Sequence, residues 1–247
     1  MTQLTDKRVV ITGGGSGIGA DMAMAFAEAG ARVTITGRRE VALQAVADQH
    51  RQLDFAVVDV TDEAAMVALF ERIGRVDIVI ANAGAAESAP FGKTSCEQWQ
   101  RMLNVNLSGV FLTLREGLKQ LNDGGRMIAV ASTAGLKGYA YVGAYCAAKH
   151  GVVGLVRSLA AETATRNITV NALCPGFTDT PLLAASVDNI MAKTGQSAEQ
   201  ATSHFQSTNP TGRLVTPAEV TATALWLCGP NSGAINGQAI SISGGEV

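Results

Sequence analysis

Three side chains in the second half of the chain have the types and spacing of an acid–base site. Tyr145 and Lys149 stand at positions i and i+4 of an Ala-rich segment, so a helix places them on one face. Nearby positive charge favours the phenolate and lowers a tyrosine pKa from its usual value of about 10. Ser132 follows a predicted strand, thirteen residues before Tyr145, and its hydroxyl could hold a carbonyl oxygen. These residues predict proton transfer to or from a carbonyl or alcohol oxygen.

The neighbouring titratable residues fit this role less well. Tyr139 and Tyr141 lack a lysine four residues later, and we expect them in a pocket wall. His150 follows Lys149 directly, but adjacent residues of a helix face different directions, which favours a structural or surface position. A tyrosine and a lysine at helical spacing can also be ordinary packing and solvated charge, and this alternative stays open.

A glycine-rich segment follows the first predicted strand. Thr12-Gly13-Gly14-Gly15-Ser16-Gly17-Ile18-Gly19 leads into a predicted helix, whose free N–H groups and dipole can hold a pyrophosphate. Glycines let the backbone approach the phosphates closely. A tight strand-to-helix turn selects glycine as well. The nucleotide-binding interpretation therefore depends on the position of the segment at the first strand–helix junction.

Taken together, these motifs resemble the short-chain dehydrogenase/reductase family. The Thr12-Gly13-x-x-x-Gly17-x-Gly19 spacing, Asp59-Val60 after the third strand, Asn82-Ala83-Gly84 after the fourth, and Ser132, Tyr145 and Lys149 appear in that order. The resemblance implies that the nucleotide contacts Thr12, Gly13, Ser16, Gly17, Ile18 and Gly19. It also implies that Asp59 and Val60 border the adenine, and that Asn82, Ala83 and Gly84 brace the sheet beside the cofactor.

The same resemblance implies a catalytic tetrad. Asn106 would join Ser132, Tyr145 and Lys149 by holding a helix kink and a water on the proton path. Tyr145 and Lys149 would also meet the cofactor, with Lys149 on the nicotinamide ribose. Pro175, Gly176, Thr178 and Thr180 would lie against the nicotinamide, Thr180 at its carboxamide, although a Pro-Gly turn explains this segment equally simply.

The end of the second strand bears on the choice of cofactor. An acidic residue there accepts hydrogen bonds from the adenosine ribose, whereas an arginine accommodates a 2′-phosphate. This chain has Gly37-Arg38-Arg39 and no acid. Arg38 therefore favours NADP(H), and NAD(H) stays possible because a solvated arginine at a helix start would look the same.

Seven short β-rich segments alternate with helical patterns such as Ile18 to Ala29 and Glu63 to Ile73. Long crossovers between successive strands make the strands parallel. We therefore expect an α/β fold, a Rossmann-type doubly wound parallel sheet of about seven strands with helices on both faces. The expected strands are Arg8 to Thr12, Arg32 to Thr36, Phe55 to Val58, Ile78 to Ile80, Arg126 to Ala131, Thr169 to Leu173 and Ala239 to Ile242.

Residues 1–247 read as a single domain, since 247 residues with 47% hydrophobic composition can bury one large core. The alternation is broken by a polar stretch from about Pro181 to Arg213, beyond the carboxyl end of a strand. Ligands bind at such ends, so 181–213 is expected to be a substrate lid, with a surface excursion as the alternative.

Composition excludes several other kinds of partner. A net charge of −2 gives no basic surplus for nucleic acid, and no apolar stretch approaches the length of a membrane span. The start of the chain shows no signal or transit pattern, so we expect a cytoplasmic protein. Cys96, Cys146, Cys174 and Cys228 lack metal-ligand or redox spacing, and the proposed chemistry needs no metal.

These expectations combine into an NAD(P)-dependent oxidoreductase that moves hydride between a nicotinamide and a ketone or secondary alcohol. The stretches 145–155 and 171–181 look most like polyketide ketoreductases and 3-oxoacyl thioester reductases, which suggests a 3-oxoacyl thioester or a polyketide-like or cyclic ketone. The alternatives are an NAD-dependent secondary alcohol or hydroxysteroid dehydrogenase, and a silent nucleotide-binding scaffold. Resemblance also implies a homotetramer, packed through the Ala-rich face of Val152 to Ala164.

Overall fold

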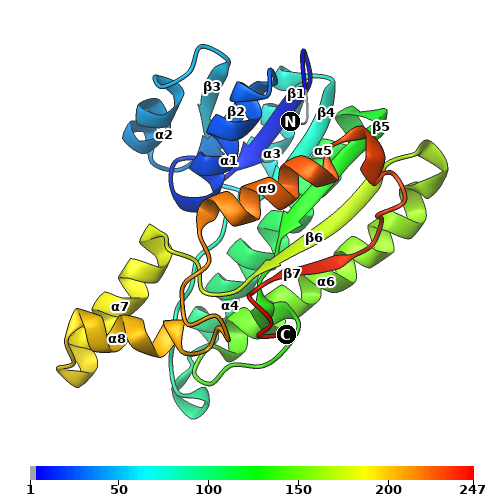
Figure 1. Cartoon of the computed structure of the whole chain (residues 1–247). Helices are drawn as coiled ribbons and strands as arrows, with labels where there is room; N and C mark the ends of the chain where they lie inside the picture. Colours follow the sequence, from blue (N-terminus) through cyan, green and yellow to red (C-terminus); the bar gives the residue numbers. More distant parts are fainter. Residues whose placement is uncertain (1–3) are drawn as a thin grey trace.

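Seven strands form one parallel sheet in the computed structural model, which describes residues 4–247. The strands are β1 (Arg8–Thr12), β2 (Arg32–Gly37), β3 (Leu53–Val57), β4 (Val76–Ala81), β5 (Leu121–Val130), β6 (Thr169–Pro175) and β7 (Ala239–Ile242). Their order in the sheet is β3-β2-β1-β4-β5-β6-β7 (Figure 1). The predicted doubly wound fold is thus confirmed.

Helices connect the strands as crossovers. The α-helices are α1 (Gly17–Glu28), α2 (Glu40–Ala47), α3 (Glu63–Ile73), α4 (Cys96–Leu103), α5 (Gly109–Gln120), α6 (Gly143–Thr163), α7 (Pro181–Thr194), α8 (Ala198–Gln206) and α9 (Pro217–Leu227). Short 3₁₀ turns are η1 (Phe91–Lys93), η3 (Thr133–Gly135), η4 (Ala164–Arg166) and η5 (Pro230–Ser232), and a π-helical segment, η2 (Asn104–Ser108), joins α4 to α5.

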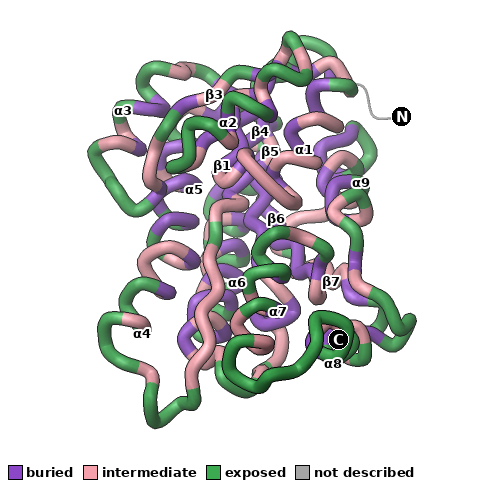
Figure 2. Tube along the Cα trace, turned by 90° about the vertical axis from the view of Figure 1, so that its left-hand side faces the viewer, coloured by how far each residue is buried: buried purple, intermediate pink, exposed green. Residues whose placement is uncertain are grey.

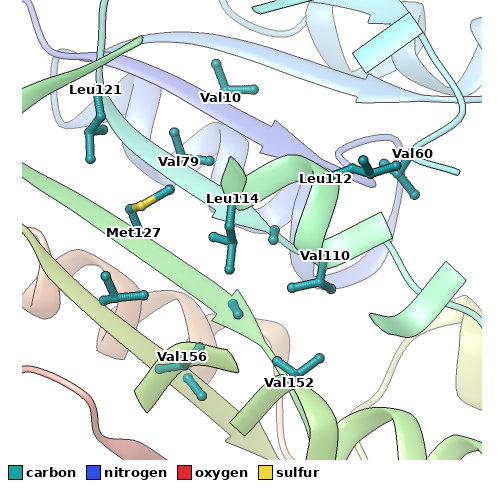
Figure 3. Packing of buried hydrophobic residues seen from close by; sticks show 14 of the residues in the cluster. Val10, Val60, Val79, Val110, Leu112, Leu114, Leu121, Met127, Val152 and Val156 are labelled. Carbon is teal, nitrogen blue, oxygen red and sulfur yellow. The ribbon is translucent and has the colours of Figure 1, made fainter. Parts of the chain in front are cut away.

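Alternation along the strands divides the core between the two faces of the sheet. Val10 packs into a cluster with α3, α5 and α6, whereas Val9 and Ile11 pack into a second cluster with α1, α2 and α9. Successive strand residues point to opposite faces, so an almost wholly apolar strand serves both clusters. Figure 3 shows the first cluster, in which Val79 and Met127 of neighbouring strands lie near Leu114.

The strand order reverses direction at β1, which pairs with β2 on one side and β4 on the other. The helices that follow β1 and β4 therefore leave to opposite faces, and in sheets of this kind ligands bind outside the carboxyl ends of these strands. This is where the glycine-rich segment and Asn82-Ala83-Gly84 emerge. The topology thus brings together motifs that are about 70 residues apart in sequence.

One strand is longer than its sequence predicts. β5 begins at Leu121 instead of Arg126, because Leu121 pairs with Val76 before a register shift in the ladder. The polar and glycine-rich residues 122–125 hide this start from a pattern search.

The stretch 181–213 is more ordered than its polar composition predicts. It forms α7 and α8, which pack on a small apolar cluster of Leu183, Val187, Ala201 and Phe205. Figure 2 shows that the outer surfaces of the two helices are largely exposed. Thr180 caps α7 with Pro181 at its first position, and Ser197 with Gln200 forms a capping box on α8. These cap signals were available in the sequence.

Only part of the α6 segment that is expected to form a subunit seam is exposed. Val152, Val153, Val156 and Ala160 are at most 5% exposed, because they pack against the sheet of their own chain. The exposed face of this segment carries Gly154, Arg157, Ser158, Ala161 and Ala164, and Leu155 and Leu159 are partly exposed. A seam on this helix would therefore use these residues and not the buried valines.

Among residues 4–247, no helix combines the length and the apolar character that crossing a membrane requires.

Candidate active site

Helix α6 positions the tyrosine and the lysine as their spacing predicts. The Lys149 ammonium lies 5.6 Å from the centroid of the Tyr145 ring, and Lys149 is only 3% exposed. Its Nζ donates a 2.8 Å hydrogen bond to the Val130 carbonyl at the end of β5. Ser132 lies two residues beyond the end of that strand, and its Oγ accepts a hydrogen bond from the Ala134 N–H. One strand end therefore fixes both the lysine and the serine.

Burial dominates the electrostatics of Tyr145. It raises the pKa of Tyr145 to about 12, and the hydrogen bond with Ser132 acts weakly in the opposite direction. The expectation that Lys149 brings this pKa down is not met in this arrangement, because the cost of burying a phenolate outweighs any help from the lysine. Tyr145 is accordingly held as the protonated acid.

Lys149 responds to burial in the opposite sense. Desolvation lowers the pKa of Lys149 to about 8, since a buried ammonium loses its hydration. The side chain can therefore gain or lose its charge near neutral pH, which suits a group that relays protons.

Asn106 lies within the π-helical segment η2 and is fully buried. Its Oδ1 accepts a hydrogen bond from the Ala85 N–H at 3.1 Å, and its Nδ2 donates to the carbonyls of Ala85 and Met102. A Cβ built on Gly84 would lie 3.0 Å from Asn106 Oδ1 and 3.8 Å from Lys149 Nζ. Asn106 and Lys149 therefore both lie close to Gly84. The helix kink expected at Asn106 is present as the π-helical segment η2.

The glycine-rich segment is locked to the end of β4. Thr12 Oγ1 accepts hydrogen bonds from the N–H groups of Asn82 and Ala83, both at 3.1 Å, and Asn82 Nδ2 donates to the carbonyls of Thr12 and Gly13. Gly13 has a φ of +69°, and a Cβ there would lie 2.8 Å from Ala83 Cα. A Cβ on Gly19 would collide with the Gly13 carbonyl oxygen. These two glycines are therefore required by close backbone contacts.

The start of α1 is open to a ligand. Ser16 stands at its N-cap, but its side chain makes no capping hydrogen bond, unlike the caps of α3, α7, α8 and α9. The first N–H groups of the helix thus remain available, as a pyrophosphate requires. Gly17 has a φ of +55°, and a Cβ there would touch Thr180 at 3.2 Å. The glycine-rich segment and the 175–180 loop therefore meet, and a dinucleotide fits the site they form.

Two arginines lie at the end of β2. Arg38 Nη1 is 3.9 Å from Asp59 Oδ2, and Arg39 Nη2 donates a 3.2 Å hydrogen bond to Ser16 Oγ. Burial acts to raise the pKa of Asp59, but hydrogen bonds from Thr61 and the charge of Arg38 outweigh it and lower the pKa. Arg39 is a candidate binding residue that sequence reasoning passed over. Its position beside Arg38 was the available signal.

Several other candidate residues have buried or core-packed side chains and could contact the cofactor only through their backbone. Val60 is 6% exposed and its side chain packs against Gly109, so only its backbone could border an adenine. Ile18 packs into the second core cluster. Pro175 is buried at the end of β6. Thr178 is also buried, and its hydroxyl donates to the Gly176 carbonyl. These residues shape the site through the backbone.

The remaining tyrosine and histidine side chains near the site differ in their exposure and contacts. Tyr141 is 65% exposed, and its carbonyl accepts a hydrogen bond from the Ala89 N–H. Tyr139 turns inward, with its ring edge against Phe177. His150 is exposed and bonds to the Cys146 carbonyl of its own helix, away from Lys149's partners.

Comparisons with known proteins agree with this geometry. A family model described as enoyl-(acyl carrier protein) reductase matches residues 13–246. A D-beta-hydroxybutyrate dehydrogenase of Rhizobium meliloti is 34% identical and covers 97% of this chain and 98% of its own length. A 3-oxoacyl-[acyl-carrier-protein] reductase of Chlamydia trachomatis is 32% identical, with 98% of each chain covered.

A crystal structure of an actinorhodin polyketide ketoreductase variant with NADPH superimposes with a TM-score of 0.89 at 33% identity. It covers 100% of this chain and 99% of that one. The predicted likeness to polyketide ketoreductases and 3-oxoacyl thioester reductases is confirmed. The chain belongs to the short-chain dehydrogenase/reductase family.

Proposed function

We propose that this protein reduces a ketone to a secondary alcohol with NADPH. The observation that carries the proposal is the meeting of Ser132, Tyr145 and Lys149 at the end of β5. Tyr145 is protonated there and Lys149 is poised to change its charge. The glycine-rich segment reaches the same edge of the sheet through Thr180.

When bound, the nicotinamide supplies the hydride for the carbonyl carbon. The residues of the chain supply orientation and protons. Ser132 holds the carbonyl oxygen, and Tyr145 donates a proton to the oxygen as negative charge develops on it. Lys149 holds the nicotinamide ribose and returns a proton toward Tyr145. Asn106 keeps the segment beside Lys149 in place through its bonds to Ala85 and Met102.

NADP(H) is the favoured cofactor. Arg38 and Arg39 follow β2, the position from which an arginine can accommodate a 2′-phosphate, and the Asp59 carboxylate is already engaged by Thr61 and Arg38. Arginine recognises phosphate through paired, charge-assisted hydrogen bonds. The similar ketoreductase structure contains NADPH, which supports the same choice.

A 3-oxoacyl thioester or a polyketide-like or cyclic ketone is the proposed substrate. The relatives named for 3-oxoacyl and polyketide reduction support this class. A second candidate is NAD-dependent oxidation of a secondary alcohol, which the hydroxybutyrate dehydrogenase relative favours. The stretch 181–213 is proposed to close over either substrate as a lid.

Turnover with a panel of ketones tests the proposal. We expect loss of NADPH absorbance at 340 nm with at least one 3-oxoacyl thioester or cyclic ketone, and slower loss with NADH. Alcohol oxidation with NAD⁺ alone would support the second candidate. Cofactor binding without turnover on any ketone or alcohol would indicate a silent scaffold and contradict the proposal.

A homotetramer is also proposed from the family relationship. The exposed face of α6 includes small residues such as Gly154, Ser158 and Ala161, so a partner helix could approach it closely. Sedimentation that shows a stable monomer at micromolar concentration would contradict this assembly.

A further inference from the structure

A buried carboxylate near the end of the chain lies under the proposed active site. The Glu246 side chain is only 2% exposed. Its Oε1 accepts a 2.5 Å hydrogen bond from the Tyr139 hydroxyl and lies 3.0 Å from Lys137 Nζ. Both partners belong to the segment 132–141, called here the Ser132 loop. Nothing in the mechanism above uses Glu246, yet burial of a carboxylate is costly unless it is paired.

Two glycines turn the chain so that Glu246 points inward. Gly244 and Gly245 have φ values of +63° and +94°, which favour glycine, and the Glu246 N–H bonds back to the Ser243 carbonyl. A Cβ on Gly244 would collide with the Asn209 side chain, so the turn also packs against the end of the 181–213 segment. The C-terminus lies beside the end of β7, at the end of the molecule where α7 and α8 lie (Figure 1).

Tyr139 connects the Glu246 carboxylate to Thr133, within the Ser132 loop, and to the 181–213 segment. Its hydroxyl lies 2.7 Å from Thr133 Oγ1, and Thr133 directly follows Ser132. Its ring meets Phe177 edge-on at 5.7 Å, and Phe177 packs on Phe205 of α8 at 4.7 Å. Burial, together with the Glu246 carboxylate, raises the pKa of Tyr139 well above its usual value, so the hydroxyl stays a donor.

The second carboxylate oxygen faces the cofactor side. Glu246 Oε2 is buried without a hydrogen-bond partner among residues 4–247. A Cβ built on Gly176 would lie 3.2 Å from this oxygen, and Gly176 belongs to the 175–180 loop. The same side chain therefore contacts the Ser132 loop through Oε1 and packs against the proposed nicotinamide loop through Oε2.

We propose that Glu246 is a positioning residue, which fixes the Ser132 loop through Tyr139 and so holds the Ser132 hydroxyl where the ketone oxygen must lie. The inference rests on the proposed function. Small displacements of a positioning group are costly, since about 1 Å can change a rate by about 100-fold. Glu246 touches neither substrate nor cofactor in this role and acts through Tyr139.

Variants of Glu246 test the proposal, with Glu71→Ala on the exposed face of α3 as the control. Glu246→Ala should lower kcat for ketone reduction by about tenfold while leaving the Kd for NADPH within about threefold. Glu246→Gln keeps an oxygen that can accept the Tyr139 hydrogen bond, and should recover most of kcat. The double variant Tyr139→Phe/Glu246→Ala should lose less than the sum of the two single losses, because both changes break the contact between Tyr139 and Glu246.

Hydrogen exchange of residues 132–141 provides a readout that does not depend on turnover. Exchange should speed up in Glu246→Ala and return toward the native rate in Glu246→Gln. Three results would each overturn the inference. The first is an exchange rate of residues 132–141 in Glu246→Ala that equals the native rate, the second is strictly additive losses of kcat in the double variant, and the third is equal losses of turnover and NADPH binding. Absence of turnover by the native protein would instead count against the proposed function, and the exchange result would still decide the role of Glu246.

Discussion

At the scale of single residues, the charge of Lys149 depends on its burial. An ammonium group in water keeps its proton to about pH 10.5, but desolvation lowers the pKa of Lys149 to about 8. Tyr145 shifts in the opposite direction, to about 12, because burial penalises its charged form. Over the range from pH 7 to 10, Lys149 is therefore the member of this pair that titrates.

This difference predicts the pH dependence of ketone reduction. Lys149 loses its positive charge as pH rises through about 8, so kcat should fall above that pH while Tyr145 remains protonated. The measurement is kcat from pH 6 to 10 at saturating NADPH and ketone. A profile that stays flat to pH 10 would show that the charge of Lys149 is not needed.

The arginines at the end of β2 predict cofactor selectivity. Arg38→Asp replaces attraction of a 2′-phosphate by repulsion, beside an Asp59 carboxylate that is already negative. NADPH affinity should fall by about tenfold or more, since charge-assisted hydrogen bonds to phosphate are strong, whereas NADH affinity should change little. Equilibrium titration with both cofactors gives the ratio. Equal affinities in the native protein, unchanged in the variant, would exclude Arg38 from discrimination.

Some functional residues can be predicted from the sequence, and others depend on tertiary contacts that the sequence does not show. Tyr145 and Lys149 were accessible because helical spacing alone places them together. Glu246 was not accessible, because its partners are more than 100 residues away and depend on the turn at Gly244 and Gly245. The outward or inward direction of Val60 also depends on tertiary packing, here against Gly109.

At the scale of elements, the turn between β1 and α1 depends on glycines in unequal degree. Gly13 combines a positive φ with a backbone contact of 2.8 Å, whereas a Cβ on Gly15 would make an ordinary 3.4 Å contact with Ala42. The two residues belong to the same segment, so they form a matched pair for substitution.

Gly13→Ala should therefore destabilise the fold by about 2 kcal/mol and weaken NADPH binding, from backbone strain and overpacking together. Gly15→Ala should change the free energy of unfolding by less than about 1 kcal/mol, the range of tolerated small changes. Urea denaturation of both variants with and without NADPH provides the comparison. Equal loss of stability in the two would contradict the stated role of Gly13.

Element boundaries were predicted well where apolar periodicity is continuous and poorly where it is not. Glu63–Ile73 forms α3 as expected, with Asp62 as its cap. The start of β5 was missed because its first pairing, Leu121 with Val76, is separated from the rest by polar residues. The helices of 181–213 were missed because polar composition was weighed above the capping signals at Thr180 and Ser197.

At the scale of the whole molecule, the parallel sheet gathers the loops that follow its strands at one edge and leaves α7 and α8 projecting there (Figure 1). Alternating strand and helix patterns predicted the parallel, doubly wound sheet but not the order of its strands, which depends on contacts between distant segments. How far the projecting pair moves relative to the sheet is a property of the molecule as a whole, and no local sequence signal encodes it.

Closure of this projecting pair can be measured by limited proteolysis. If residues 181–213 cover bound substrate, nicking within them should slow when NADPH and a ketone are present together. The control is nicking elsewhere in the chain, which should change less. Identical rates with and without ligands would show that the segment does not act as a lid.

We propose that Tyr145 donates the proton that completes ketone reduction. Tyr145→Phe removes one hydroxyl, so the fold and the Kd for NADPH should be preserved while kcat falls by about 100-fold or more. Tyr141→Phe, at an exposed tyrosine just before α6, is the matched control and should retain nearly native kcat. Lys149→Ala should lower both kcat and NADPH affinity, because the lysine serves the proton path and the ribose. Single-substrate kinetics of these variants on a ketone that the native enzyme reduces is the decisive measurement. Tyr145→Phe alone should lose turnover with cofactor binding intact, and a kcat above about a tenth of the native value would contradict the role of Tyr145 as the proton donor.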